Sequence, residues 1–209
     1  MTRKQWKIIL WVNLAVVIMV LSPFLPGPSF LSSASNFIFS LTQLASLPGL
    51  LIIPIGLIWT ENQAYKKEKG QRKALPILLW TVPMLTFILT MWGSDFVRDF
   101  SRNIAIRNAS GIIKSIENYK EQNNTYPSNL SELAPQFIKE VPSPGIMGIG
   151  GYGYEKKDET YNLTFSQNVI MGFNFEVVVY DPSQNHQAKG ALQTLYDTGN
   201  EKWKYYIYD

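Results

Sequence analysis

The sequence predicts an α+β protein in two parts: a membrane anchor of three transmembrane helices in residues 1–93, and an outer domain in residues 94–209. Two observations predict the anchor. No Asp, Glu, Lys or Arg lies within residues 8–60 or 74–94, and these stretches are long enough for three helices that cross a bilayer. A third observation predicts the outer domain. Beyond Asp95 the hydrophobic pattern has first the period of a helix and then the period of strands.

The three predicted spans are residues 6–25, 37–59 and 74–92. A helix of about 20 residues crosses the roughly 30 Å of hydrocarbon in a bilayer, and each segment reaches about that length. No ionisable side chain lies deep in any span, which argues against a pump, an ion-coupled transporter or an intramembrane protease. The spans are therefore expected to act as an anchor. Tryptophans, which prefer the membrane interface, lie at their ends: Trp6, Trp59 and Trp92.

Polar and small residues within the spans are expected to join the helices to one another. Asn13, Thr42 and Gln43 offer hydrogen bonds between helices. Gly49 and Gly56 allow neighbouring helices to approach closely.

The basic residues beside the spans predict the orientation of the chain. The N-terminus carries three basic residues and no acidic one, residues 61–73 carry five basic and two acidic ones, and residues 26–36 carry neither. Because basic loops stay in the cytoplasm, the N-terminus and residues 61–73 should lie inside a cell (inner) membrane. The outer domain should then be periplasmic or extracellular. An alternative is a signal peptide that is cleaved near residues 31–35, which leaves the outer domain on the same side.

The net charge of +3 does not indicate a nucleic-acid-binding protein, because the basic excess lies beside the spans. From Asp95 onward the chain has eleven basic and fourteen acidic residues. Cysteine is absent, so the outer domain depends on its own hydrophobic core rather than on disulfides.

The outer domain is predicted to pair one long helix with an antiparallel sheet. Apolar residues recur every three or four positions in residues 95–122, which is typical of an amphipathic helix. A shorter helix is expected over residues 129–138 and a turn-rich link over residues 142–153. The pattern then becomes that of strands, and the long helix should cover one face of their sheet. The expected strands are residues 160–166, 173–180, 191–196 and 203–208, with residues 152–154 as an edge.

Residues 112–142 follow a recognisable order of motifs. They run from the helix end Ile116-x-x-Tyr119 through a polar turn to Tyr126-Pro127, a Leu130-x-x-Leu133 helix and Val141-Pro142. This run resembles type IV pilins and type II secretion pseudopilins. The resemblance covers about half of the outer domain, and it implies a pilin-like fold and contacts with other envelope proteins.

The segment before the outer domain departs from that family. A pilin begins with a short basic leader, a processing glycine and an apolar helix with a glutamate at its fifth mature position. Here the preceding helix is a third span without glutamate, and Gly70 is followed by a polar and basic run that includes Arg72 and Lys73. We therefore expect neither leader cleavage nor filament assembly, but a pilin-like domain on a fixed multi-span anchor.

No catalytic constellation is visible in the sequence, so the chain is not expected to be an enzyme. His186 is the only histidine, and it lies in a polar run that is typical of a solvated loop. The glycines of residues 145–153 lack the Lys-Ser/Thr ending of a phosphate-binding loop. No cofactor is predicted, although the pilin resemblance implies calcium in the sheet loops. Oxygen ligands there would be Asp181, Asn185 and Asp197.

The aromatic residues of the outer domain are the candidate interaction surface. About half of the strand residues should face the core by alternation, and the others offer contact area at low entropic cost. The alternative is that they form cross-strand pairs on a solvated sheet face. The residues predicted to contact a protein or glycan are Tyr152, Tyr154, Trp203, Tyr205, Tyr206 and Tyr208.

Together these features predict a membrane-anchored, extracytoplasmic, pilin-like interaction module, with an envelope or secretion assembly as its expected setting. The expected partners are the lipid bilayer and other envelope proteins, with no nucleic acid and no identifiable small-molecule substrate. Two alternatives stay open, namely a subunit of an envelope enzyme and a ligand-sensing membrane protein. The sensor is disfavoured because residues 61–73 are too few to form a signalling domain.

Overall fold

The structure is a computed structural model that describes residues 2–67, 74–169, 174–189 and 193–208. Within these ranges the side chains of residues 46–53, 60–61, 63–67 and 74–76 are outside the description.

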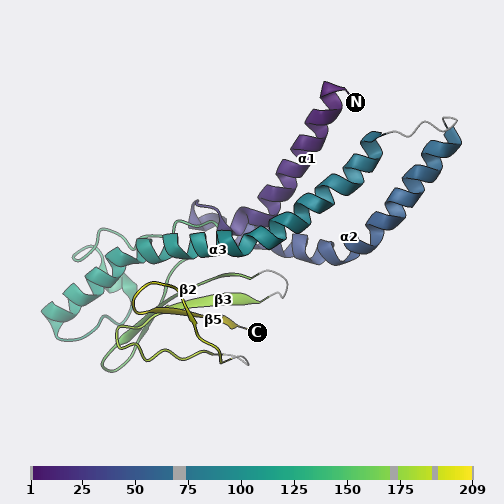
Figure 1. The fold of residues 1–209 in the computed structure, drawn as a ribbon. Coiled ribbons are helices and arrows are strands. Elements are labelled where there is room, and N and C mark those ends of the chain that lie inside the picture. Colours follow the sequence, from purple (N-terminus) through teal and green to yellow (C-terminus); the bar gives the residue numbers. More distant parts are fainter. Residues whose placement is uncertain (1, 68–73, 170–173, 190–192, 209) are drawn as a thin grey trace. The chain divides into compact units, whose positions relative to one another are not determined.

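The chain divides into two compact units. The helical unit comprises Met1–Ser22 and Phe37–Asp95, and the α+β unit comprises Pro23–Asn36 and Phe96–Asp209. The chain enters the α+β unit for the last time after Asp95, and Pro23–Asn36 also belongs to the α+β unit. The sequence had placed that segment in the anchor. Figure 1 shows the elements in the order of the chain.

Three helices contribute to the helical unit. They are α1 (Arg3–Leu21), most of α2 (Ser32–Lys67) and the first part of α3 (Ala74–Asn123). A capping box begins α1: the Thr2 hydroxyl accepts from the backbone N–H of Gln5 at 3.3 Å, and the Gln5 side chain accepts from the N–H of Thr2 at 2.8 Å. This pair satisfies backbone donors that the helix itself leaves without partners.

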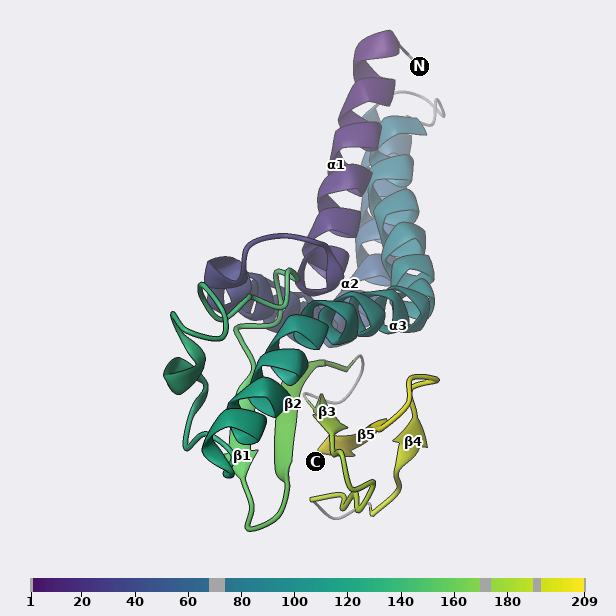
Figure 2. The same ribbon diagram turned by 90° about the vertical axis from the view of Figure 1, so that its left-hand side faces the viewer.

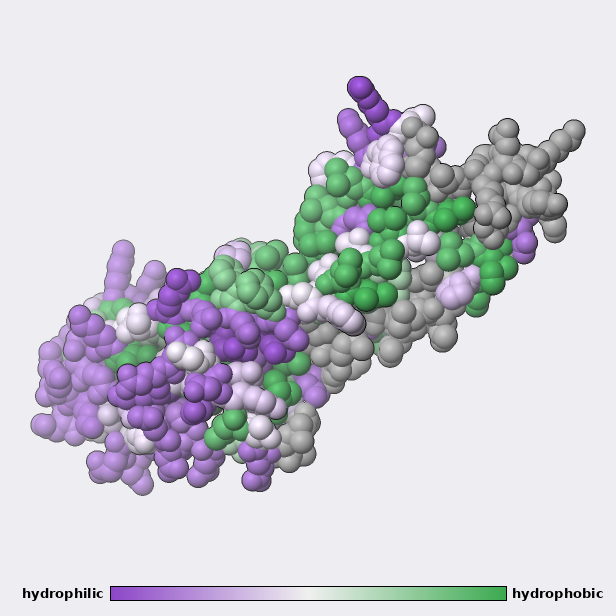
Figure 3. Space-filling model, viewed as in Figure 1, coloured by the Kyte–Doolittle hydropathy of each residue, from purple (hydrophilic) through white to green (hydrophobic). Residues whose placement is uncertain are grey.

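Two described segments are long and apolar enough to cross a membrane, Arg3–Phe24 and Ile77–Asn123. The core helix of a soluble protein would be mostly buried, whereas only 28% and 11% of their most apolar windows are buried. Figure 3 shows the exposed apolar residues of the helical unit in green. The first segment lies near the N-terminus, where a signal sequence has the same length and composition. These features favour association with a membrane.

The structure thus supports two of the three predicted spans. The span predicted over residues 37–59 lies within α2, a helix of 36 residues, but it is not among the described segments that qualify by length and composition. Residues 46–53, at its centre, lie outside the described side chains. The span over residues 37–59 therefore stays a prediction.

Polar and small residues join the helices of this unit. The Thr86 hydroxyl of α3 donates a hydrogen bond to the side-chain oxygen of Asn13 in α1, which confirms Asn13 as an interhelical partner. Gly56 of α2 lies against the Trp80 indole of α3, and a Cβ atom on Gly56 would stand 2.8 Å from that ring. A larger residue there would push the two helices apart. Gly49 lies outside the described side chains.

The α+β unit contains a five-stranded antiparallel sheet in the order β1-β2-β3-β5-β4 (Figure 2). Each predicted strand has a counterpart; the strand predicted over residues 203–208 has the predicted ends, and the others have shifted ends. The weak strand expected over residues 191–196 is reduced to two residues, and residues 190–192 lie outside the description. The strands are β1 (Gly153–Lys156), β2 (Tyr161–Asn168), β3 (Phe175–Tyr180), β4 (Tyr196–Asp197) and β5 (Trp203–Tyr208).

The second part of α3 covers one face of this sheet, as the sequence predicted. The helix and the sheet form the hydrophobic core of the unit between them. Fully buried residues recur on the helix at steps of three or four: Ala105, Ala109, Ile112 and Ile116. Alternate residues of the central strands complete the same cluster, because strand side chains alternate between faces. They include Leu163, Phe165, Val178 and Trp203.

The helix predicted over residues 129–138 is shorter in the structure. Only a 3-10 turn forms, η3 (Leu130–Leu133), and the Asn129 side chain caps its start. Ala134 is already extended, with φ −97° and ψ 143°. Pro135 explains this early end, because the residue before a proline is sterically disfavoured in the helical conformation.

Pro23–Asn36 pairs with the glycine-rich link through backbone hydrogen bonds. This segment includes the 3-10 turn η2 (Ser29–Leu31), and a β-bridge joins Pro26 to Ile146. The segment therefore extends the α+β unit. The bonds run from Gly148 N to Pro23 O at 2.9 Å, from Met147 N to Leu25 O at 3.0 Å and from Gly27 N to Gly145 O at 3.0 Å.

Close approach explains one glycine of this link, and backbone conformation explains another. A Cβ atom on Gly148 would stand 2.3 Å from the carbonyl oxygen of Pro23, closer than real atoms come. Gly145 has a φ of +73°, which glycine adopts without the steric cost that other residues incur. The glycine-rich link thus packs against and pairs with Pro23–Asn36.

Candidate functional site

The structure places two of the six predicted interaction residues in the interior. Trp203 and Tyr206 are only 4% exposed. The Trp203 ring packs against Phe165 and Tyr180, with centroids 5.9 and 5.2 Å away. Neither side chain belongs to the surface of the unit, so this part of the predicted surface is wrong.

Tyr152 and Tyr154 are half-buried and occupied by contacts within the unit. The Tyr152 hydroxyl donates to the carbonyl oxygen of Ala105, and the Tyr154 hydroxyl donates to that of Pro127 at 2.8 Å. Burial raises the pKa of both phenols above its usual value. Both phenols therefore act as neutral hydrogen-bond donors that hold chain segments together.

Tyr208 is exposed at the surface, and Tyr205 is partly exposed. Tyr208 is 40% exposed and stacks on Phe175, with ring centroids 5.0 Å apart. Tyr205 is half-buried, stacks on Tyr196 at 5.1 Å and lies under the guanidinium of Arg102, 4.0 Å from the ring centroid. These two residues stay predicted contact residues.

A buried ion-pair network lies between α3 and the sheet, and the sequence did not predict it. Glu176 of β3 is fully buried. Arg102 Nε donates to Glu176 Oε1 at 2.6 Å, and the terminal nitrogen Nη2 donates to Oε2 at 2.7 Å. Arg98 approaches the same carboxylate, with 3.2 Å between Nε and Oε2. The two-pronged pairing compensates much of the cost of burying these charges.

The charge state of Arg102 is secured by its partners. Burial alone would lower the pKa of its guanidinium, but the hydrogen bond and the charge of Glu176 outweigh that effect and raise the pKa. Asp99 adds a contact at 2.9 Å from the more exposed side. Arg102 is therefore a fixed cation.

Gln167 of β2 is buried and belongs to the same network. Its amide nitrogen donates to Glu176 Oε1 at 3.0 Å and to the backbone oxygen of Arg98 at 3.2 Å. Its amide oxygen accepts from the Ser101 hydroxyl. These bonds hold the Gln167 side chain in one orientation.

A sequence signal for this network exists. Gln167 and Glu176 are direct partners across β2 and β3, and each continues the helix-facing alternation of its strand beyond the apolar residues. Arg98 and Arg102 are four residues apart, so they share one face of α3. A polar pair on a core face opposite a basic pair indicates a buried salt bridge. The register needed to see it comes only from the folded sheet.

A polar cavity of about 380 Å³ opens beside Gln167. It is built from three segments of the α+β unit that are distant in sequence: the start of α2, the glycine-rich link, and the adjoining ends of β2 and β3. None of its lining residues is charged. They are Ser32, Asn36, Gly148, Gly150, Ser166, Gln167, Asn168 and Phe175.

Hydrogen bonds fix the walls of this polar cavity. Asn36 Nδ2 donates to the carbonyl oxygen of Gly148 at 3.0 Å, and Asn168 Nδ2 donates to Asn36 Oδ1 at 2.7 Å. The chain Asn168–Asn36–Gly148 therefore ties β2, α2 and the link together around the cavity. Such a preformed, concave polar site is a candidate for binding a ligand.

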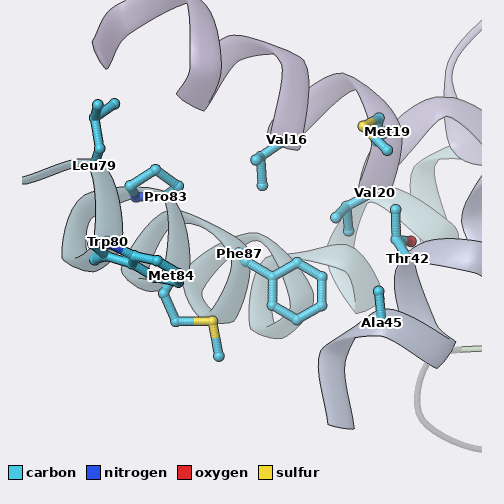
Figure 4. A pocket seen from close by; sticks show the side chains of 10 residues that line it. All are labelled: Val16, Met19, Val20, Thr42, Ala45, Leu79, Trp80, Pro83, Met84 and Phe87. Atoms are coloured by element: carbon cyan, nitrogen blue, oxygen red, sulfur yellow. The ribbon is translucent and has the colours of Figure 1, made fainter. Parts of the chain in front are cut away.

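The helical unit contains a separate apolar pocket of about 290 Å³ (Figure 4). Side chains from all three helices line it. The Thr42 hydroxyl donates to Phe39 O of its own helix at 2.7 Å, and the Trp80 indole N–H is the other polar side-chain group of the lining. The lining is otherwise apolar and suits an apolar group. The lining is Val16, Met19, Val20, Thr42, Ala45, Leu79, Trp80, Pro83, Met84 and Phe87.

The remaining candidate residues, His186, Asp181, Asn185 and Asp197, lie outside the linings of both cavities. No group of three or more His, Cys, Asp or Glu residues there could hold a metal ion. His186 Nε2 lies 3.1 Å from the carbonyl oxygen of Lys202. Asp181 Oδ1 accepts from the backbone and hydroxyl of Ser183 at 2.8 and 2.6 Å. The calcium ligands implied by the pilin resemblance, Asp181, Asn185 and Asp197, stay a prediction.

No protein-family model, curated protein or solved structure matches the chain. The pilin-like relationship therefore stays a prediction from the motifs of residues 112–142.

Proposed function

We propose that this protein is a membrane-anchored interaction module whose α+β unit binds partners on the extracytoplasmic side. The observation that carries the proposal is the difference between the surfaces of the two units. The helical unit exposes apolar side chains that need lipid, such as Leu89 at 68% and Trp92 at 83%. The α+β unit has a polar surface and a preformed, uncharged cavity. An anchor and a binding domain in one chain are the parts that such a module needs.

The proposed orientation has the N-terminus and residues 61–73 in the cytoplasm. Positive charge in those two segments supports it. The pairing of Pro23–Asn36 with the glycine-rich link adds support, because it requires the first loop and the outer domain to lie on the same side of the membrane. The distribution of basic residues independently predicts that the first loop and the outer domain lie on the same side.

A fixed domain, rather than a filament subunit, is part of the proposal. The chain passes between the two units three times, after Ser22, Asn36 and Asp95. The α+β unit is covalently joined to all three helices of the helical unit, so it cannot leave the membrane unless all three helices leave together. We therefore propose envelope proteins as partners, in an assembly at the membrane or in its secretion machinery.

Site-specific photo-cross-linking in intact cells tests this function. A photoreactive amino acid at Tyr208, on the exposed aromatic pair, should form an adduct with another envelope protein. The matched control is the same amino acid at Lys114, which is exposed on the opposite, solvent-facing side of α3. Adducts at Tyr208 and not at Lys114 would support the proposal. No adduct, or equal labelling from both positions, would contradict it.

A further inference from the structure

We propose that the polar cavity of the α+β unit is a saccharide site that takes one neutral sugar residue. The first argument is charge. The lining contains three amide side chains, two hydroxyl side chains, two glycines and one aromatic ring, and no Asp, Glu, Lys, Arg or His. A phosphate, carboxylate or ammonium group would find no counter-charge there. The matching ligand is therefore uncharged.

The second argument is hydrogen-bonding capacity. Ser32 and Ser166 have hydroxyl groups with no hydrogen-bond partner among the described residues, and each can donate and accept. Asn168 uses its amide nitrogen for Asn36, which leaves its amide oxygen as an acceptor toward the cavity. Hydrogen-bond donors and acceptors thus lie close together in the cavity lining. A sugar hydroxyl, which also donates and accepts, matches this mixture.

The third argument is the aromatic ring at the edge of the cavity. Phe175 is 40% exposed, and Tyr208 supports its ring from one side in a stacked arrangement with an interplanar angle of 21°. A flat, rigid aromatic surface beside polar groups suits a ligand with one apolar and one polar side. The C–H face and the hydroxyl groups of a pyranose ring provide those two sides.

The size of the cavity limits the ligand to a small molecule. The lining residues of β2 are paired with β3 alone, because the pairing of β2 with β1 ends at Thr164. The cavity offers mainly side chains and glycine backbone. Its volume, about 380 Å³, lies near the lower end of the range for small-molecule sites.

The buried network makes the site rigid before a ligand arrives. Gln167 forms part of the wall and is held by Glu176, Ser101 and the backbone of Arg98. Asn36 and Asn168 hold each other. A wall that is already ordered loses little entropy on binding, which favours a small ligand with few contacts. The Glu176 carboxylate thus acts through Gln167 as a positioning group.

Binding of neutral sugars to the full-length protein in lipid nanodiscs tests the proposal. The probes are glucose, galactose, mannose, N-acetylglucosamine and their short oligomers, followed by calorimetry and by saturation-transfer NMR. At least one sugar should bind. Phe175→Ala should weaken that binding roughly fivefold to tenfold, because the stacking surface is lost. Ser166→Ala removes one hydroxyl from an exposed position and should weaken it as well.

The matched control is Tyr196→Ala. Tyr196 is 42% exposed and stacks on Tyr205 at 5.1 Å, so it resembles Phe175 in exposure and stacking but lies outside the cavity lining. This variant should bind as the wild type does. Tighter binding of oligomers than of monomers would identify a glycan end as the source of the sugar, and equal binding would identify a free sugar.

Two results would overturn the inference. One is that no sugar binds while circular dichroism shows a folded protein. The other is that binding survives both Phe175→Ala and Ser166→Ala unchanged. Neither result affects the cross-linking test at Tyr208, so the saccharide site and the proposed function fail or stand separately.

Discussion

At the scale of single residues, Glu176 has the largest expected effect on stability. It is fully buried and receives hydrogen bonds from Arg102 and Gln167, with Arg98 close to the same carboxylate. Removing one partner of a buried ion pair leaves the other charge without compensation in a medium of low polarity. The arginines, rather than the glutamate, would then destabilise the fold.

Glu176→Gln should lower the free energy of unfolding by about 3 kcal/mol, because the buried guanidinium of Arg102 and the partly buried one of Arg98 lose their counter-charge. The comparison is Asp99→Asn, which removes a carboxylate that is 57% exposed and contacts the same Arg102. That change should alter the free energy by less than about 1 kcal/mol. Denaturant titration of both variants, followed by near-ultraviolet circular dichroism, measures the difference. Equal effects would show that Glu176 contributes no more than a surface charge.

At the scale of elements, the sequence predicted what periodicity can specify. The helix face of Ala105, Ala109 and Ile112 and the strand pattern of β2 follow directly from spacing. The aromatic residues show the limit. Alternation assigns Tyr206 to the face of the sheet opposite α3, yet it does not say whether that face is covered, and Tyr206 is buried. Local steric effects also escape a hydrophobic pattern, as Pro135 shows by ending the short helix early.

The pairing of Pro23–Asn36 with the link was not predictable from spacing, because glycines and prolines carry no hydrophobic period. Its dependence on Gly148 can be tested. Gly148→Ala would place a Cβ atom 2.3 Å from Pro23 O, whereas Gly151→Ala meets no atom within 4 Å. We expect Gly148→Ala to break the backbone pairing and Gly151→Ala to preserve it.

Hydrogen exchange measures this outcome. In Gly148→Ala the backbone amides of Gly27 and Met147, which are bonded across the pairing, should exchange roughly tenfold faster or more, since local opening becomes easier. In Gly151→Ala they should exchange at the wild-type rate. Unchanged protection in Gly148→Ala would mean that the segment is held by other contacts.

At the scale of the whole molecule, orientation is the property on which the proposed function depends. The chain contains no cysteine, so single introduced cysteines report on accessibility without background. Ser33→Cys and Lys157→Cys should react with a membrane-impermeant maleimide in intact cells or spheroplasts. Lys69→Cys should react only after the membrane is permeabilised. Opposite behaviour of Ser33→Cys and Lys157→Cys would contradict a shared location of the first loop and the outer domain.

The pairing of Pro23–Asn36 also has a consequence for biosynthesis. Asn36 is hydrogen-bonded to Gly148, 112 positions later in the chain. The early segment is synthesised long before its counterpart, and the rest of α2 and all of α3 are made in between. Contacts of such long range form slowly, because the intervening chain must be ordered first. The α+β unit can therefore be completed only after translation of the whole polypeptide, which makes a truncated product a substrate for quality-control proteases.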